Sequence, residues 1–154
     1  MKQKLLKFLK EYGLYVAWLQ ALVSTVGSLF LSQIMQFPPC DLCWYQRILM
    51  YPLVLILGVG IIRKDKNVVW YSFPLTILGL IVAFYHILLQ EGFIPHALAP
   101  CGLSAVTCGA KYLNLLGFIT IPILSFAAFA IIAGCLVAYK QSLPLRGKKL
   151  NNIK

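Results

Sequence analysis

Residues 67–90 read NVVWYSFPLTILGLIVAFYHILLQ and contain no Asp, Glu, Lys or Arg. A helix needs about 20 consecutive apolar residues to cross the roughly 30 Å hydrocarbon core of a bilayer, and this stretch is long enough. Residues 12–40 and 112–139 are equally free of these charged residues and also long enough. With 60% hydrophobic and 12% charged residues, the chain is predicted to be an all-α integral membrane protein.

A fourth uncharged window, residues 48–62, is too short to span the bilayer unless its helix begins near Asp41 or Trp44. Such a start places Arg47 in the first turns, where its apolar stem lets the charged group reach the interface. We therefore predict one domain, residues 1–154, built as a bundle of four transmembrane helices. The predicted helices are 14–34, 44–62, 68–89 and 114–138, and the predicted outer loops are 35–43 and 90–113.

The basic residues predict the orientation of the bundle. Of 14 Lys and Arg residues, all except Arg47 and Lys111 precede the first helix, lie between the second and third, or follow the fourth. Cytoplasmic loops of membrane proteins carry an excess of Lys and Arg, so both termini are predicted to be cytoplasmic. The net charge of +10 is then a signal of orientation in the lipid bilayer, and we expect no nucleic-acid partner.

Each outer loop carries a pair of cysteines, Cys40 with Cys43 and Cys101 with Cys108. In this topology both pairs face an oxidising compartment, where disulfides form and persist. Cys135 lies near the cytoplasmic end of the last helix and is expected to be a small buried apolar residue. The outer pairs allow three interpretations, namely structural disulfides, a zinc site with thiolate ligands, and redox catalysis.

Residues 37–47, FPPCDLCWYQR, favour redox catalysis. The two prolines keep the chain unwound up to the first cysteine, so that the second helix begins just after it. If Asp41 caps this helix, Cys43 lies in the first turn, where unpaired N–H groups and the helix dipole stabilise a thiolate. Arg47 follows one turn deeper on the same face. A structural disulfide needs neither feature, and a zinc site already supplied with thiolates does not call for an arginine.

Three features together resemble the DsbB family of membrane thiol:quinone oxidoreductases, and most closely its compact Gram-positive branch, often called BdbC. They are CDLCWYQR at the start of the second helix, a second cysteine pair in the next outer loop, and LGFITIP opening the fourth helix. The resemblance covers nearly the whole chain. It implies an enzyme of the bacterial cytoplasmic membrane, a protein dithiol:quinone oxidoreductase that supports disulfide bond formation in exported proteins.

The resemblance also implies the partners of this enzyme. The electron donor is expected to be an extracytoplasmic thioredoxin-like thiol oxidase of the DsbA or BdbD type, which the enzyme reoxidises. The electron acceptor is expected to be a membrane quinone, with menaquinone as the preferred prediction. No metal or haem is expected.

By position, the resemblance implies two redox-active disulfides, Cys40–Cys43 and Cys101–Cys108. The first pair matches the CxxC that reduces the quinone, with Cys43 nearest the ring, and the second matches the pair that exchanges with the partner oxidase.

Two further residues match the quinone site of the family. Arg47 matches the arginine that supports quinone binding. His86, in AFYHILLQ, matches a family histidine close to the quinone.

Overall fold

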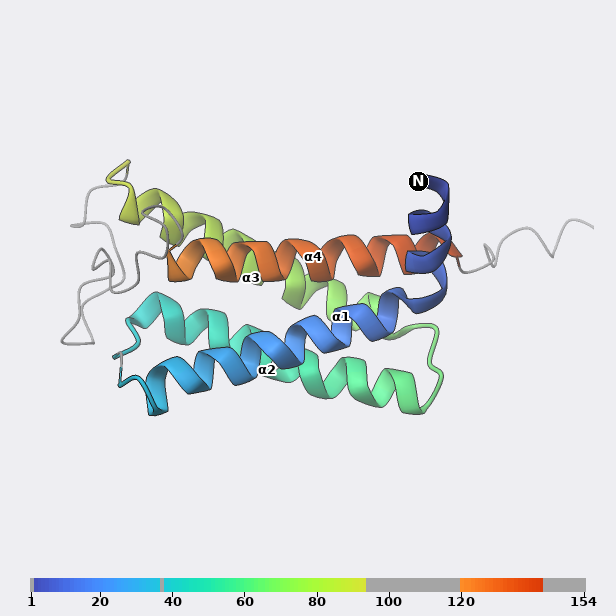
Figure 1. Ribbon diagram of the computed structural model, residues 1–154, viewed down its shortest axis with the longest axis horizontal. Coiled ribbons are helices and arrows are strands. Elements are labelled where there is room, and N and C mark those ends of the chain that lie inside the picture. The colour runs from blue at the N-terminus through green and yellow to red at the C-terminus, as the bar shows by residue number, and fades with distance from the viewer. Residues whose placement is uncertain (1, 37, 94–119, 143–154) are drawn as a thin grey trace, which may run out of the picture.

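The computed structural model describes residues 2–36, 38–93 and 120–142, which form four α-helices and, within these ranges, no strand (Figure 1). The helices are α1 (Lys2–Gln33), α2 (Asp41–Ile62), α3 (Val68–Gln90) and α4 (Ile121–Ser142). Each contains a segment long and apolar enough to cross a membrane, namely 12–33, 41–62, 68–90 and 121–141. The prediction of a four-helix membrane protein is confirmed, while Cys101, Cys108 and Lys111 lie outside the described residues.

Several helix boundaries differ from the predicted ones. α1 begins at Lys2 and not at 14, because Lys and Leu are good helix formers and the helix continues beyond its apolar part. α2 begins at Asp41 and not at 44, directly after the extended backbone of Cys40 (φ −72°, ψ 168°). The expectation that Asp41 caps this helix is therefore wrong, since Cys40 holds the cap position and Asp41 is the first helical residue.

The start of α4 is described from Thr120 onward. Thr120 is not helical and α4 begins at Ile121, while the predicted start at residue 114 lies outside the described residues. Pro122 lies in the first turn, where its missing N–H removes a donor that would have no intrahelical partner. The sequence of this turn therefore suits a helix start.

The four helices pack as a ring in which each contacts two neighbours. Extensive contacts join α1 to α2, α2 to α3, α3 to α4, and α4 back to α1. The core between them contains large side chains such as Phe129, Leu53 and Ile132 together with small residues such as Ala17 and Ala83. Small residues let helices approach closely in a membrane, where apolar burial alone does not drive association.

The outer surface of the bundle is apolar on every helix. Large exposed apolar side chains include Val26 on α1, Leu55 on α2, Ile81 on α3 and Ile131 on α4. A soluble bundle would place polar residues at these positions. The exposed apolar surface is the one expected of helices that face lipid.

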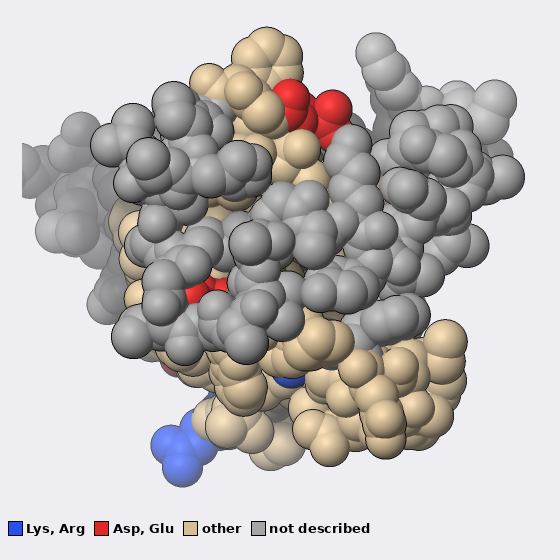
Figure 2. All heavy atoms as spheres, turned by 90° about the vertical axis from the view of Figure 1, so that its left-hand side faces the viewer, with Lys and Arg blue, Asp and Glu red and all other residues tan. Residues whose placement is uncertain are grey.

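The two ends of the bundle carry different parts of the chain (Figure 1). One end holds the N-terminus of α1, the α2–α3 connection with its basic residues, and the last turn of α4. There the ammonium group of Lys140 lies 4.0 Å from the centroid of the Trp70 ring, which joins α4 to α3. The other end holds the α1–α2 connection, which includes Cys40. Figure 2 views this second end, where the described surface shows only isolated charged groups. The cytoplasmic location of the termini stays a prediction.

Candidate active site

Cys40 and Cys43 form a close pair at the start of α2. Cys40 is buried and Cys43 half-buried, and both are free thiols in the structure. Their Sγ atoms lie 2.9 Å apart, which is a hydrogen-bonding contact and longer than the roughly 2.05 Å of a covalent S–S bond. The spacing of the CxxC therefore brings the two sulfurs within reach of disulfide formation, and the Cys40–Cys43 disulfide itself stays a prediction.

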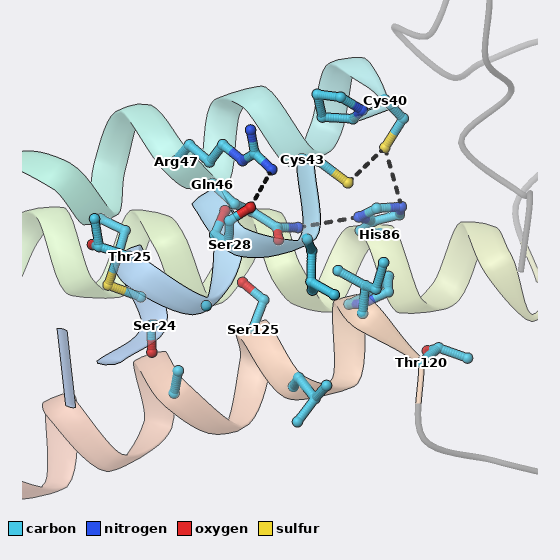
Figure 3. Close-up of a pocket in the computed structure, with 18 of the residues that line it drawn as sticks. Ser24, Thr25, Ser28, Cys40, Cys43, Gln46, Arg47, His86, Thr120 and Ser125 are labelled. Atoms are coloured by element: carbon cyan, nitrogen blue, oxygen red, sulfur yellow. Dashed lines mark hydrogen bonds between the residues drawn. The ribbon is translucent and has the colours of Figure 1, made fainter. Parts of the chain in front are cut away.

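His86 reaches this pair from α3 (Figure 3). Its side chain is only 2% exposed, and its Nε2 lies 3.8 Å from the Sγ of Cys40. On the other side of the ring, Nδ1 lies 3.1 Å from the Nε2 of Gln46, which is also buried. Because the amide nitrogen of Gln46 only donates, Nδ1 accepts, and the ring proton lies on Nε2, from which it is donated to Cys40.

Gln46 is the site residue that the sequence analysis missed. It lies within WYQR, one turn after Cys43, but received no role. A buried polar side chain in a membrane helix is uncommon and marks a functional site more often than a structural one. That signal was available in the sequence, although its partner on α3 was not.

The contacts that stabilise a thiolate converge on Cys40. The hydrogen bond from Cys43 lowers the pKa of the Cys40 thiol well below its usual range, and the hydrogen bond from His86 lowers it further, although burial opposes both. The position of Cys43 in the first turn of α2 predicts the stabilised thiolate there. The structure differs because the cap position brings Cys40 within reach of His86 on α3, and the sequence of α2 alone does not reveal this contact.

Arg47 joins α2 to α1. Its Nη2 donates to the backbone carbonyl oxygen of Ser28 at 2.9 Å, and its guanidinium carbon lies 5.5 Å from the centroid of the Trp44 ring. A guanidinium has five N–H donors, so the bond to Ser28 leaves others available. Arg47 is thus held in place within the bundle while keeping donor capacity for a ligand.

A cavity of about 310 Å³ lies beside these residues, between the four helices. Its polar wall includes Cys40, Cys43, Gln46, Arg47 and His86, and its apolar wall is completed by side chains of α1, α2 and α4 such as Val23, Met50 and Leu124. A mostly apolar pocket of this size with a few polar groups suits a small organic ligand.

The same cysteine pair and His86 could also hold a metal ion. The Sγ atoms of Cys40 and Cys43 and a ring nitrogen of His86 all lie within 4.8 Å of one another. Structural zinc sites use four protein ligands, whereas catalytic zinc sites use three and keep one position open. The three candidate ligands found here match the number in a catalytic zinc site but not in a structural one. The expectation of no metal therefore stays a prediction.

Comparison with known proteins identifies the family. A family profile described as "Disulfide bond formation protein DsbB" matches residues 10–139. The chain belongs to the DsbB family. The resemblance seen in the sequence is confirmed, and DsbB-family membership makes the chain a multi-pass membrane protein and an oxidoreductase of disulfide bond formation.

Individual relatives support the DsbB assignment. "Probable disulfide formation protein C 2" of Bacillus cereus is 48% identical over 127 residues, which covers 82% of this chain and 90% of that protein. The protein of the same name in Bacillus anthracis is 49% identical over 121 residues, covering 79% of this chain and 85% of its own. "Probable disulfide formation protein" of Coxiella burnetii is 43% identical over 142 residues, which covers 91% of this chain and 95% of that protein. No solved structure matches the chain.

Proposed function

We propose that this protein is a dithiol:quinone oxidoreductase of the bacterial cytoplasmic membrane. It reoxidises an extracytoplasmic thioredoxin-like thiol oxidase of the DsbA or BdbD type and passes the electrons to a membrane quinone, with menaquinone preferred. Through this partner it supports disulfide bond formation in exported proteins. Membership of the DsbB family supports the disulfide chemistry, and the geometry of the CxxC supports the acceptor.

The observation that carries the proposal is that a dithiol lines a cavity between membrane helices. Cys40 and Cys43 share this cavity with Arg47 and His86, and the remaining wall is mostly apolar. An apolar wall accommodates a flat ring, while a guanidinium and an imidazole offer hydrogen bonds to ring oxygens. The residues present therefore fit a quinone headgroup.

The chemistry at the CxxC releases two electrons and two protons. When Cys40 and Cys43 become a disulfide, an S–S bond forms and two S–H bonds are lost. A bound quinone supplies the acceptor for both electrons and both protons. His86 lies where it can hold a proton at Nε2 beside Cys40, and Gln46 keeps the ring in that orientation.

The second cysteine pair completes the electron path in this proposal. The partner's dithiol reduces a Cys101–Cys108 disulfide by thiol–disulfide exchange and itself becomes a disulfide. The resulting Cys101–Cys108 dithiol then reduces the Cys40–Cys43 disulfide by the same exchange. Both cysteines of the second pair lie outside the described residues, so their part rests on the family and on the sequence.

The proposal is tested by following quinone reduction with purified protein, a reduced thioredoxin-fold protein and a short-chain menaquinone analogue. We expect turnover with the wild type and none with Cys43→Ser, because the disulfide can no longer form. Cys135→Ser is the matched control, since Cys135 is buried in the core on α4 and takes no part in the site, and it should keep wild-type turnover. Arg47→Ala should raise the KM for the quinone. An inactive wild type, or full activity in Cys43→Ser, would contradict the proposal.

The same preparation separates the two alternatives. A metal-binding protein would carry zinc in stoichiometric amount, and its thiols would resist alkylation in the folded state. A membrane subunit merely braced by disulfides would keep both pairs oxidised in cells, and Cys43→Ser would change its stability alone. Metal analysis and alkylation of the purified chain therefore distinguish all three functions.

A further inference from the structure

Two buried hydroxyl groups beside the cavity have no hydrogen-bond partner. Among the described residues, the buried side-chain polar atoms without a partner are the Oγ1 atoms of Thr25 and Thr120. Both residues line the cavity that contains the CxxC. Buried polar groups are hydrogen-bonded in the large majority of cases, so this coincidence calls for an explanation.

Other buried hydroxyls in the bundle show the usual arrangement. Ser72 and Thr76 on α3 each donate to the backbone carbonyl oxygen four residues earlier, at 2.8 Å. Such bonds satisfy a hydroxyl inside an apolar helix without any ligand. The two threonines at the cavity are therefore exceptions within this fold and not a general feature of its hydroxyl groups.

Thr120 combines the missing partner with deep burial at a helix start. It is only 3% exposed and directly precedes α4, where its carbonyl oxygen accepts from the N–H of Leu124 at 3.1 Å. A threonine at such a position commonly uses its hydroxyl to cap the first turn, but this hydroxyl does not. The positive end of the α4 dipole adds a preference for an oxygen that carries partial negative charge.

The position of Thr120 places it at the level of the redox cysteines. The start of α4 lies at the same end of the bundle as the start of α2 (Figure 1), and Thr120 occurs at the start of α4 in the site (Figure 3). Thr25 lies eight residues before the end of α1, about 12 Å deeper at the usual helical rise. The hydroxyl of Thr120 is therefore the better placed of the two for a headgroup that must reach Cys43.

We propose that Thr120 is a binding residue for the quinone headgroup, with its hydroxyl hydrogen-bonded to a ring oxygen. This inference rests on the proposed function, and it adds a contact from α4 to those expected from Arg47 and His86. A hydroxyl both donates and accepts, so Thr120 serves the carbonyl of the oxidised ring and the hydroxyl of the reduced ring alike. The guanidinium of Arg47 only donates.

The test compares three variants of the full chain in the quinone-reduction assay. Thr120→Val removes the hydroxyl at nearly constant shape, Thr120→Ser keeps it, and Thr76→Val removes a buried hydroxyl that already has a partner. We expect Thr120→Val to raise the apparent KM for the menaquinone analogue about three- to tenfold, the factor that corresponds to one ordinary hydrogen bond. Thr120→Ser and Thr76→Val should keep a KM close to that of the wild type.

A binding measurement without turnover gives a second readout. The menaquinone analogue should raise the Tm of the wild type, and this rise should shrink in Thr120→Val. Without the quinone, the Tm of Thr120→Val should not fall, because an unpartnered buried hydroxyl costs stability. An unchanged KM and an unchanged quinone-induced Tm rise in Thr120→Val, with an active wild type, would overturn the inference. An inactive wild type would instead overturn the proposed function.

Discussion

Cys40 is the residue whose surroundings distinguish the two sulfurs of the CxxC. Its Sγ lies 2.9 Å from Cys43 and 3.8 Å from the Nε2 of His86, and Gln46 holds the imidazole from its far side. A thiolate that receives two hydrogen bonds is stabilised relative to the thiol. In the dithiol form, these contacts favour the thiolate at Cys40.

This arrangement predicts how the pKa of Cys40 responds to mutation. In a chain carrying Cys101→Ser, Cys108→Ser and Cys135→Ser, adding Cys43→Ala should raise the pKa of Cys40, because its strongest hydrogen bond is lost. Because this pKa is lowered, the Cys40 thiolate stabilises the folded, reduced protein. The stabilisation is fully present at pH values above the ordinary thiol pKa of about 8.5. That stabilisation is lost as the pH falls through the lowered folded-state pKa.

Titration of the thiolate ultraviolet absorbance measures this pKa in both chains. Reduced protein with Cys43 intact should keep its thiolate to lower pH than the Cys43→Ala chain. Equal midpoints in the two chains would show that the Cys43 contact does not stabilise the thiolate.

At the scale of elements, the contact between α3 and α4 depends on a glycine. A Cβ atom at Gly79 would overlap the ring of Phe129, which is fully buried in the core. The ring can therefore occupy its place only because α3 has no side chain there. This contact sets how closely α4, and with it Thr120, approaches α3, the helix that carries His86.

Gly79→Ala is predicted to destabilise the bundle by about 1–3 kcal/mol, the usual cost of overpacking a core. The buried Phe129 ring cannot move aside without displacing its neighbours. Gly134→Ala on α4 is the matched control, because a Cβ there meets nothing within 4 Å. It should be neutral or slightly stabilising, since alanine favours a helix more than glycine does. Thermal unfolding in detergent measures both, and equal Tm values for the two variants would contradict the prediction.

In the whole molecule, the basic residues and the CxxC lie at opposite ends of the bundle. The basic α2–α3 connection and the last turn of α4 lie at one end, and the CxxC lies at the other (Figure 1). The positive-inside rule predicts that the basic end faces the cytoplasm. In that predicted orientation, the cysteine end faces the oxidising side of the membrane, as the proposed exchange with an exported partner requires.

The orientation is tested by labelling single cysteines in a chain whose five native cysteines are replaced by serine. Met35→Cys, in the exposed α1–α2 connection, should react with a membrane-impermeant maleimide in intact cells with a permeable or removed wall. Asn67→Cys, at the start of α3, should react only after the membrane is opened. The reverse pattern would place the CxxC in the cytoplasm and contradict the proposed function.

The four spans, the family and the position of the first cysteine pair follow from the linear sequence alone. Crossing a bilayer requires a long uninterrupted apolar run, which is a property of the linear chain. The CxxC is equally local, because residues three apart at a helix start must lie close together. Helix ends were less well predicted, since the apolar run marks the membrane and not the helix, as the extension of α1 to Lys2 illustrates.

Which side chains meet across the helices depends on the three-dimensional packing of the bundle. The helices are apolar on nearly all sides, so the periodicity of the sequence does not reveal which face of each helix is turned inward. The contact of His86 with Cys40, the bond from Arg47 to Ser28 and the unpartnered hydroxyl of Thr120 all depend on that rotation. Packing between the helices sets the rotation of each helix about its own axis. Close approach at small residues such as Gly79 is possible in one rotation and excluded in others.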